Sequence, residues 1–456
     1  MKRSIILTLF CFLITLPLLS SLVAQETGID TQKLDQYFTA LYENDRFMGS
    51  VAVLDGNETV FEAAYGVIDS DETNATTESI YRIGSITKCY TSVMILQLVE
   101  EGSLSLETTL DTYYPDLPNA GQITIEQMLR HTSGLVNFTN SPDYMSYFAG
   151  EATKDEMLDR FASLGTSFEP GTNSEYSNTA YVLLGYIIED VTGRSYADVL
   201  QERITGPLDL TSTYFASGID SEMNEADSFV YQQDRWQAAS RTNMFIPHGA
   251  GAIVSTAEET ARFFHALFNG ELLSEASLEQ MTRFDGQFGL GLLRFPFGER
   301  ILYGHNGGID GFQSNSAHYP GDNLTFAVLS NGMNYPFNDV LIGMLSITFG
   351  QPFEIPNFEE RSAMTLEPSE LESYTGVYSS ENFPLNIELF IQGENLMAQA
   401  TGQGSFPLTI YDEKTMAFEQ AGIEIVFQDP ENGQYTEFRF SQAGQQFDFT
   451  RQSSDE

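Results

Sequence analysis

The feature that most constrains the fold is a change of residue pattern near position 350. Residues 25–350 mix strand-like and helix-like patterns, whereas residues 369–456 contain only short alternating runs separated by turn residues. Between them, residues 351–368 contain three prolines and indicate a connecting stretch. A chain of 456 residues exceeds one average domain. We therefore expect a large domain, a linker and a smaller C-terminal domain.

The large region carries strand signals at both ends and helix signals between them. Near its start, two strand-like runs flank the turn residues Asp55-Gly56-Asn57, which predicts a β-hairpin. Strands at both ends predict an α+β domain whose two ends share one antiparallel sheet. The expected strands are Val51–Leu54, Thr59–Tyr65, Ile301–His305, Phe312–Tyr319 and Leu324–Leu329, and the expected helices run from Ser85 to about Glu101, over Thr179–Val191, from Ser255-Thr256 towards Gly270, and over Val340–Phe349.

The C-terminal region alternates apolar and polar residues in short runs. Leu385–Ile391, Ile423–Phe427 and Tyr435–Phe440 are each followed by a cluster of turn residues. Runs of this length and spacing predict a small antiparallel barrel or sandwich.

The N-terminus has the pattern of an export signal. Lys2 and Arg3 precede an apolar run from Ile5 to Leu19, and small residues follow up to Ala24. This pattern predicts a signal peptide over residues 1–24 that is cleaved near Ala24, and therefore an exported protein, periplasmic or secreted. An uncleaved anchor is the alternative, although the run is short for a membrane span.

The charge balance narrows the possible partners. The chain carries 21 basic and 64 acidic residues, a net charge of −43. Such a field repels nucleic acid and anionic membranes, so we expect neither as a partner, and no membrane insertion after signal cleavage. This charge also favours solubility at high salt, so a saline habitat is one hypothesis. The alternative is that the acidic residues only form a well-solvated surface. Only Cys89 remains after the signal, which leaves no internal disulfide.

Ser85 and Lys88 form the first chemically suggestive pair, within Gly84-Ser85-Ile86-Thr87-Lys88. Spacing of three residues at the start of a helix places both side chains on one face. A sheltered lysine can lose its charge and accept the proton of a serine hydroxyl. The pattern alone is also that of a capped surface helix with a solvated lysine.

Two further motifs carry polar groups. In Tyr176-Ser177-Asn178, on a loop after Pro170-Gly171, a phenol can relay protons if nearby cations lower its pKa, and an amide can hold a carbonyl. The plainer interpretation is a packed ring beside a helix cap. In Tyr303-Gly304-His305-Asn306-Gly307-Gly308 a strand signal meets glycines that permit close backbone approach. A lone histidine there is more often structural.

Taken together, the three motifs resemble the Ser-x-x-Lys, Tyr-x-Asn and Lys/His-x-Gly boxes of the serine β-lactamase and penicillin-binding protein superfamily. The class C-like branch, with its DD-carboxypeptidases, D-aminopeptidases and esterases, is the most similar. The resemblance covers roughly residues 30–345 and includes three supporting segments: Ile123–Leu135 with its His131-Thr132-Ser133-Gly134, Glu169-Pro170-Gly171, and Pro247–Gly251 before Ser255-Thr256.

The resemblance implies a β-lactamase/transpeptidase-like domain with helices on both faces of the sheet and an all-helical lobe. It also implies an acyl-enzyme on Ser85, with Lys88 as base and Tyr176 as proton shuttle. Substrate contacts would come from Asn178, His305, Gly307 and Gly308, and the backbone N–H groups of Ser85 and Gly308 would form the oxyanion hole. No metal or organic cofactor is implied. Leu371–Tyr378 resembles the start of the lipocalin-like extension often attached to such hydrolases.

His305 departs from the lysine that many β-lactamases carry in the third box. A neutral imidazole holds a carboxylate less firmly than an ammonium, which puts β-lactam hydrolysis in doubt. Protonation near pH 6.5 would make the imidazolium mimic lysine. The substrate remains open among peptides, amides and esters, and the oligomeric state does not follow from the sequence. His131, His265 and His318 are interpreted as structural, and His248 is undecided.

The sequence supports three rival functions less well. An α/β-hydrolase needs a Gly-x-Ser-x-Gly elbow, which the chain lacks. A zinc hydrolase needs clustered ligands, and five histidines without a His-Glu-x-x-His motif make a poor case for one. The serious alternative is a non-turnover penicillin-binding, sensor or scaffold protein of the same fold.

Overall fold

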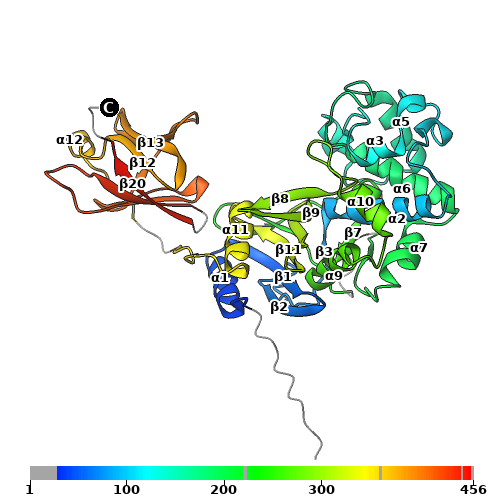
Figure 1. Cartoon of the computed structure of the whole chain (residues 1–456), viewed down its shortest axis with the longest axis horizontal. Helices are drawn as coiled ribbons and strands as arrows, with labels where there is room; N and C mark the ends of the chain where they lie inside the picture. Colours follow the sequence, from blue (N-terminus) through cyan, green and yellow to red (C-terminus); the bar gives the residue numbers. More distant parts are fainter. Residues whose placement is uncertain (1–27, 217, 219–222, 359–361, 443–444, 453–456) are drawn as a thin grey trace, which may run out of the picture.

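A computed structural model describes residues 28–456 except 217, 219–222, 359–361, 443–444 and 453–456 (Figure 1). The expected signal peptide, residues 1–24, lies outside the described residues. In the part that is described, no helix is long and apolar enough to cross a membrane.

The large domain is built on a mixed sheet in which the first and last strands are neighbours. The main path runs β2-β1-β11-β10-β9-β8, with β5 and β6 attached beside β11. Because β1 pairs antiparallel with β11, the predicted sharing of one sheet by both ends of the region is confirmed. The strands are β1 (Phe47–Asp55), β2 (Glu58–Tyr65), β5 (Phe229–Tyr231), β6 (Trp236–Ala238), β8 (Leu293–Phe297), β9 (Arg300–Ile309), β10 (Phe312–Tyr319) and β11 (Leu324–Met333).

Helices cover both faces of this sheet, as predicted. Side chains alternate along β1, so Val51 and Val53 pack with α1 (Thr31–Glu43) and α11 (Phe337–Thr348). Ala52 and Leu54 belong to the other core, to which α9 (Ala257–Phe268) contributes. Both faces of the strand are therefore buried.

The remaining helices form a lobe beside the sheet, to the right in Figure 1. At its centre lie α2 (Thr87–Glu100) and α6 (Asn178–Thr192), both of which are buried over most of their length. A small sheet, β3 (Tyr81–Arg82), β7 (Ile253–Ser255) and β4 (Tyr214–Phe215), joins lobe and main sheet. The other helices are α3 (Ile125–Leu129), α4 (Tyr144–Tyr147), α5 (Lys154–Leu164), α7 (Tyr196–Leu200), α8 (His248–Gly251) and α10 (Glu275–Thr282).

The C-terminal part is a nine-stranded antiparallel sheet that nearly closes into a barrel, and it confirms the predicted small all-β domain. Its interior is packed with rings, among them Tyr378, Phe427, Phe438 and Phe449. A short helix, α12 (Pro368–Leu371), precedes it. The strands are β12 (Gly376–Ser380), β13 (Phe383–Gln392), β14 (Asn395–Ala400), β15 (Phe406–Pro407), β16 (Thr409–Ile410), β17 (Thr415–Phe418), β18 (Ile423–Phe427), β19 (Glu437–Gln442) and β20 (Gln445–Arg451).

Local details differ from the sequence predictions. Ser85 lies in a 3₁₀ turn, η1 (Gly84–Ile86), and α2 begins only at Thr87. Asn178 is the first residue of α6 rather than a loop residue, because Ser177 supplies the N-cap. Ser177 accepts the hydrogen bond from Ala180 N, which is the usual N-cap contact.

Candidate active site

The Ser85 segment is shaped by its contact with β9. The chain leaves β3 and turns at Gly84, whose φ of +52° favours glycine. A Cβ on Gly84 would lie 2.9 Å from the backbone nitrogen of Gly308, so glycine is also needed sterically. Ser85 then stands half-buried in the 3₁₀ turn that leads into α2. The turn brings the serine and the Gly308 strand into one narrow region.

Lys88 is fully buried beneath Ser85. Its Nζ lies 3.0 Å from Ser85 Oγ, 2.8 Å from Asn178 Oδ1 and 2.7 Å from the carbonyl oxygen of Ala250. Burial disfavours the ammonium and holds the pKa of Lys88 well below its ordinary value. A neutral amine has two N–H donors, which the amide and carbonyl oxygens accept, so its lone pair is left for the Ser85 hydroxyl.

Tyr176 lies against the same two residues. Lys88 Nζ is 4.8 Å from the centre of its ring, and its hydroxyl hydrogen-bonds Ser85. Burial raises the pKa of Tyr176, and the Ser85 hydrogen bond only partly opposes this. The sequence predicted a proton relay on the condition that nearby cations lower the pKa of Tyr176. That condition is wrong, because the pKa is raised. The phenol is protonated at neutral pH and can act first as a proton donor.

Asn178 connects Lys88 to the loop before α4. Its Oδ1 accepts from Lys88, and its Nδ2 donates to Thr139 Oγ1 at 3.1 Å. Its backbone N–H donates to Asn137 Oδ1. Both ends of the amide thus have protein partners, so its contact with a substrate carbonyl requires Nδ2 to exchange or share Thr139.

His305 is buried on β9, where its Nδ1–H donates to the carbonyl oxygen of Asn306. Burial, the main cause, lowers its pKa to about 3. The expected protonation near pH 6.5 is therefore wrong, because burial disfavours the charged imidazolium. At neutral pH His305 presents Nε2 as an acceptor, and its ring centre lies 6.2 Å from that of Tyr176.

The two glycines of the third motif have different surroundings. A Cβ on Gly307 would lie 2.1 Å from the carbonyl oxygen of Ile83, so glycine at 307 lets β9 pack against the Ser85 segment. A Cβ on Gly308 would have open space, with Phe312 O at 3.9 Å. Packing accounts for Gly307, whereas Gly308 is the residue whose backbone nitrogen faces the turn at Gly84.

His131 supports Tyr176. It adopts a φ of +57°, and its Nδ1 accepts a hydrogen bond from Ser177 N at 3.1 Å. Its ring centre is 4.5 Å from that of Tyr176. Burial holds the pKa of His131 well below its ordinary value, so it stays neutral. The predicted turn-forming histidine therefore also packs against the tyrosine of the site.

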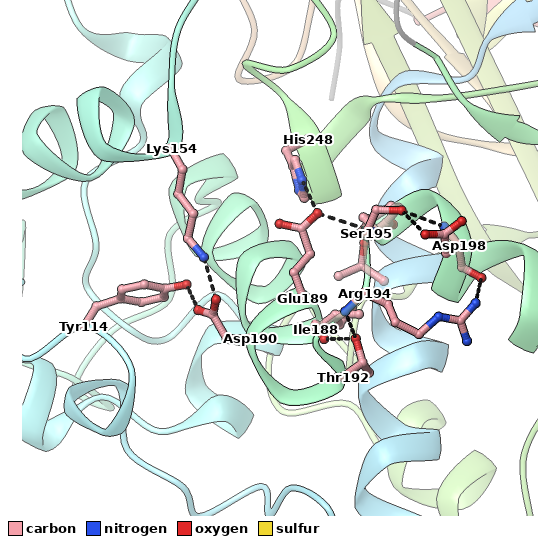
Figure 2. Close-up of polar contacts among 12 residues, drawn as sticks. Tyr114, Lys154, Ile188, Glu189, Asp190, Thr192, Arg194, Ser195, Asp198 and His248 are labelled. Atoms are coloured by element: carbon pink, nitrogen blue, oxygen red, sulfur yellow. Dashed lines mark hydrogen bonds and ion pairs between the residues drawn. The ribbon is translucent and has the colours of Figure 1, made fainter.

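The undecided His248 anchors the short helix that carries Ala250. Its Nε2 lies 3.6 Å from Glu189 Oε1, which also accepts from Tyr196 N at 3.0 Å. Gly185 faces the imidazole, and a Cβ there would lie 2.4 Å from Nδ1. Figure 2 shows this contact between α8 and α6, and beside it the separate Lys154–Asp190 ion pair. His248 thus helps place the carbonyl that Lys88 contacts.

The remaining histidines sit away from these groups. His318 Nδ1 lies 2.8 Å from Thr325 Oγ1, and its ring stacks on Phe268. His265 contacts the Asn269 side chain on the same helix. Over the described ranges, no group of three or more His, Cys, Asp or Glu residues is placed to hold a metal ion.

Sequence reasoning missed the groups that support Lys88 and Asn178. The Ala250 carbonyl, Thr139 and Asn137 all contact one of these two residues. Ala250 lies in a segment that the resemblance singled out, but a backbone carbonyl has no residue signature. Its role could be read only from the fold.

Comparison with known proteins agrees with this arrangement. The chain matches the family described as "Beta-lactamase" over residues 34–344. It is 26% identical over 428 residues to Penicillin-binding protein 4* of Bacillus subtilis (strain 168), covering 86% of this chain and 93% of that protein. D-amino acid amidase from Ochrobactrum anthropi SV3, complexed with D-phenylalanine, superposes with a TM-score of 0.59 at 26% identity, over 69% of this chain and 99% of that one.

A third similarity extends the fold into the C-terminal part. The octameric penicillin-binding protein homologue from Pyrococcus abyssi superposes with a TM-score of 0.63 at 22% identity, over 93% of this chain and 100% of that one. At that identity the likeness concerns the fold alone. The family match spans well over half of the residues, and the protein belongs to the Beta-lactamase family of β-lactamase-fold hydrolases.

Proposed function

We propose that the protein is a serine hydrolase that forms an acyl-enzyme on Ser85 and cleaves an amide, peptide or ester bond. The observation that carries this proposal is the environment of Lys88: a fully buried amine, 3.0 Å from Ser85 Oγ, with two other oxygens to accept its N–H groups. Burial lowers the pKa of Lys88 and so favours the neutral amine, and a neutral amine beside a hydroxyl can act as a general base.

In the proposed acylation, Ser85 Oγ bonds to the substrate carbonyl carbon while its proton passes to Lys88 Nζ. The carbonyl electron pair moves onto oxygen, which the N–H groups of Ser85 and Gly308 stabilise. Tyr176, protonated at rest, gives its proton to the leaving nitrogen or oxygen as that bond breaks, and the proton on Lys88 restores the phenol. Water then attacks the ester on Ser85, and the same groups act in reverse order.

We further propose that the substrate is neutral or carries an amine, rather than a carboxylate, near the scissile bond. Of the basic side chains described around Ser85, Lys88 has its charged form disfavoured by burial, and Arg82 is paired with Asp310. His305 is neutral at any pH well above 3. With a net charge of −43, the field of the chain also repels anions. D-amino-acid amides and esters fit these conditions and the amidase likeness.

The division of the chain is part of the proposal. Residues 1–24 would direct export to the periplasm or medium, residues 25–350 would form the hydrolase domain, and residues 351–368 would link it to the β-domain of 369–456. Retention of residues 1–24 on the protein recovered from outside the cell would contradict the proposed cleavage, and mass spectrometry of its N-terminus decides this.

The central test is covalent labelling with a fluorophosphonate and a fluorescent penicillin side by side, with steady-state assays on esters and D-amino-acid amides. The wild type should bind one fluorophosphonate at Ser85 and turn over neutral substrates, and Ser85→Ala should do neither while remaining folded. A label mapped to another serine would overturn the proposal. A stoichiometric burst without turnover would instead indicate the sensor or scaffold alternative.

A further inference from the structure

A buried ion pair lies next to the site and takes no part in the proposed mechanism. Arg82 Nη1 lies 2.7 Å from Asp310 Oδ2, and each side chain is only 3% exposed. Thr242 completes the cluster: its N–H and Oγ1 donate to Asp310 Oδ1 at 3.0 and 2.7 Å, and its carbonyl oxygen accepts from Arg82 at 2.9 Å. Three segments distant in sequence are thereby joined.

The pair brackets the contact between the Ser85 segment and β9. Arg82 ends β3, two residues before Gly84, and Asp310 lies in the β9–β10 turn, two residues after Gly308. Between these ends the two backbones touch, because a Cβ on Gly84 would lie 2.9 Å from Gly308 N. Ser314 Oγ donates to the carbonyl oxygen of Ile83 at 2.8 Å and fixes the same contact from β10.

The hairpin geometry directs the Gly308 N–H towards this contact. Asp310 and Gly311 form a two-residue turn closed by the Ile309–Phe312 pair, and Gly308 is paired with Gln313. Hydrogen-bonded and non-hydrogen-bonded pairs alternate in an antiparallel ladder, and the pair that closes a two-residue turn is hydrogen-bonded. The N–H of Gly308 therefore points away from β10, to the side on which Gly84 and Ser85 lie.

Stability alone is a weak reason for such a pair. Taking two charges out of water costs about as much as their attraction returns, and apolar replacements are often equally stable. Burial lowers the pKa of Arg82, against the opposing effect of Asp310. Its Nε is buried with no hydrogen-bond partner among the described residues. The pair instead connects two backbone segments, the end of β3 and the β9–β10 turn.

We propose that Arg82 and Asp310 are positioning residues that hold the N–H groups of Ser85 and Gly308 at the separation needed to bind one oxyanion. The inference rests on the proposed function, since an oxyanion forms only if a carbonyl is attacked at Ser85. Neither side chain touches the substrate. They act through the backbone of β3 and of the β9–β10 turn.

Two variants test the pair. Asp310→Asn keeps the size of the side chain and suits the φ of +55° at this position, but removes the charge. Arg82→Lys keeps the charge but replaces the guanidinium, whose Nη1 contacts both Asp310 and Thr242, by a shorter side chain with a single ammonium. The measurements are kcat and KM for a neutral ester, and inhibition by phenylboronic acid. Ser85 Oγ adds to its boron, Lys88 takes the proton, and a boron hydroxyl occupies the oxyanion position.

Both variants should lower kcat and weaken boronate inhibition in parallel, by about 10- to 100-fold, which is below the loss of a whole oxyanion donor. KM should change by less than about threefold, because the ground-state carbonyl depends little on the two N–H groups. A purely structural pair would instead lower thermal stability and leave kcat per folded molecule and boronate affinity unchanged.

Two controls complete the experiment. Glu101→Gln removes a surface ion pair, in which Arg203 Nη1 lies 2.8 Å from Glu101 Oε1, and should leave both readouts at wild-type values. The double variant Arg82→Met with Asp310→Asn removes both buried charges, keeps a residue that suits the φ of +55° at position 310, and should fold while still losing boronate affinity. Folded variants with wild-type kcat and boronate affinity would overturn the inference alone. A wild type without turnover would remove the proposed function as well.

Discussion

The two large sheets of this protein are both antiparallel in most of their strand pairs, but they bury different kinds of residue. In the large domain β1 is buried on both faces, whereas strands of the C-terminal barrel such as β18 alternate between buried and partly exposed positions. Among the described residues, every buried side chain that is polar or charged, tyrosines aside, lies at or before Thr348. The barrel interior holds apolar and aromatic side chains instead.

This difference indicates which domain can hold an active site made of buried polar side chains. A buried polar group is costly unless it has partners, so a cluster of them persists only where the fold supplies those partners. Lys88, His305 and Arg82 are such groups, and each has a hydrogen-bond acceptor within its own domain. The barrel core has no equivalent in the part of the chain that is described. Substitutions in the large domain should therefore change turnover far more than changes in the barrel.

The largest effects are expected at the two proton-transfer groups. In the proposed mechanism Lys88→Ala removes the base and Tyr176→Phe removes the proton donor to the leaving group, so each should lower kcat/KM by about 10²–10⁴-fold. Because the proposed mechanism needs a neutral Lys88, the kcat/KM of the wild type should rise with pH through the lowered lysine pKa and then level off. Steady-state assays of a neutral ester across pH measure both. Near-wild-type rates in either variant would remove that residue from the mechanism.

His305→Lys should have a smaller effect, confined to substrate preference. An ammonium near a bound carboxylate is worth about 5–150-fold in relative preference when partly desolvated. Acylation by benzylpenicillin should therefore rise relative to a neutral ester of similar size. In the wild type this ratio should not respond to His305 between pH 5 and 8, because its pKa is about 3. An unchanged ratio in the variant would show that position 305 does not face the substrate.

Acid sensitivity of folding gives a further, smaller effect. Unfolded His305 takes up a proton below about pH 6.5, whereas the folded side chain does so only near 3. The unfolded state therefore binds more protons in this window, and the free energy of unfolding falls as pH drops through it. Urea unfolding at pH 7 and pH 4.5 should show a smaller loss for His305→Gln than for the wild type.

The matched variant for this measurement is His318→Gln. Burial lowers the pKa of His318 to about 4, so its window is narrower and its effect should have the same sign but be smaller. Equal acid losses in the wild type and His305→Gln would contradict the buried, neutral state assigned to His305.

Much of this molecule could be predicted from sequence because its signals are local. The Asp55-Gly56-Asn57 hairpin, the helix α6 and the three motifs all involve residues a few positions apart. The Arg82–Asp310 pair joins residues 228 positions apart, and nothing in either segment indicates the other. The neutrality of His305 depends on burial, and the acceptor for Lys88 is a backbone carbonyl. Contacts between residues far apart in the sequence, and the effect of burial on a pKa, could therefore not be predicted from the sequence.

The smallest effect on chemistry is expected from removing the barrel. Its core contains no residue before Leu366, and its described polar contacts with the large domain are few, such as Gln445 Nε2 to Ser346 Oγ at 3.2 Å. Deleting residues 369–456 should leave a folded domain whose acylation rate stays within about threefold of the full chain, because all three motifs precede the cut.

The structure also offers a cleaner cut for this experiment. Leu366 packs in the barrel core and Met364 pairs with Ile410. Deletion from residue 369 therefore leaves these two apolar side chains without their packing partners. A second truncation that removes residues 364–456 takes them away with the barrel, and should be the more soluble of the two while acylating at the same rate. Fluorophosphonate labelling rates and thermal unfolding of both truncations measure this. If both truncations are folded but inert, the barrel contributes to the active site. The difference between the two large sheets would then not mean that the large domain alone carries the reaction.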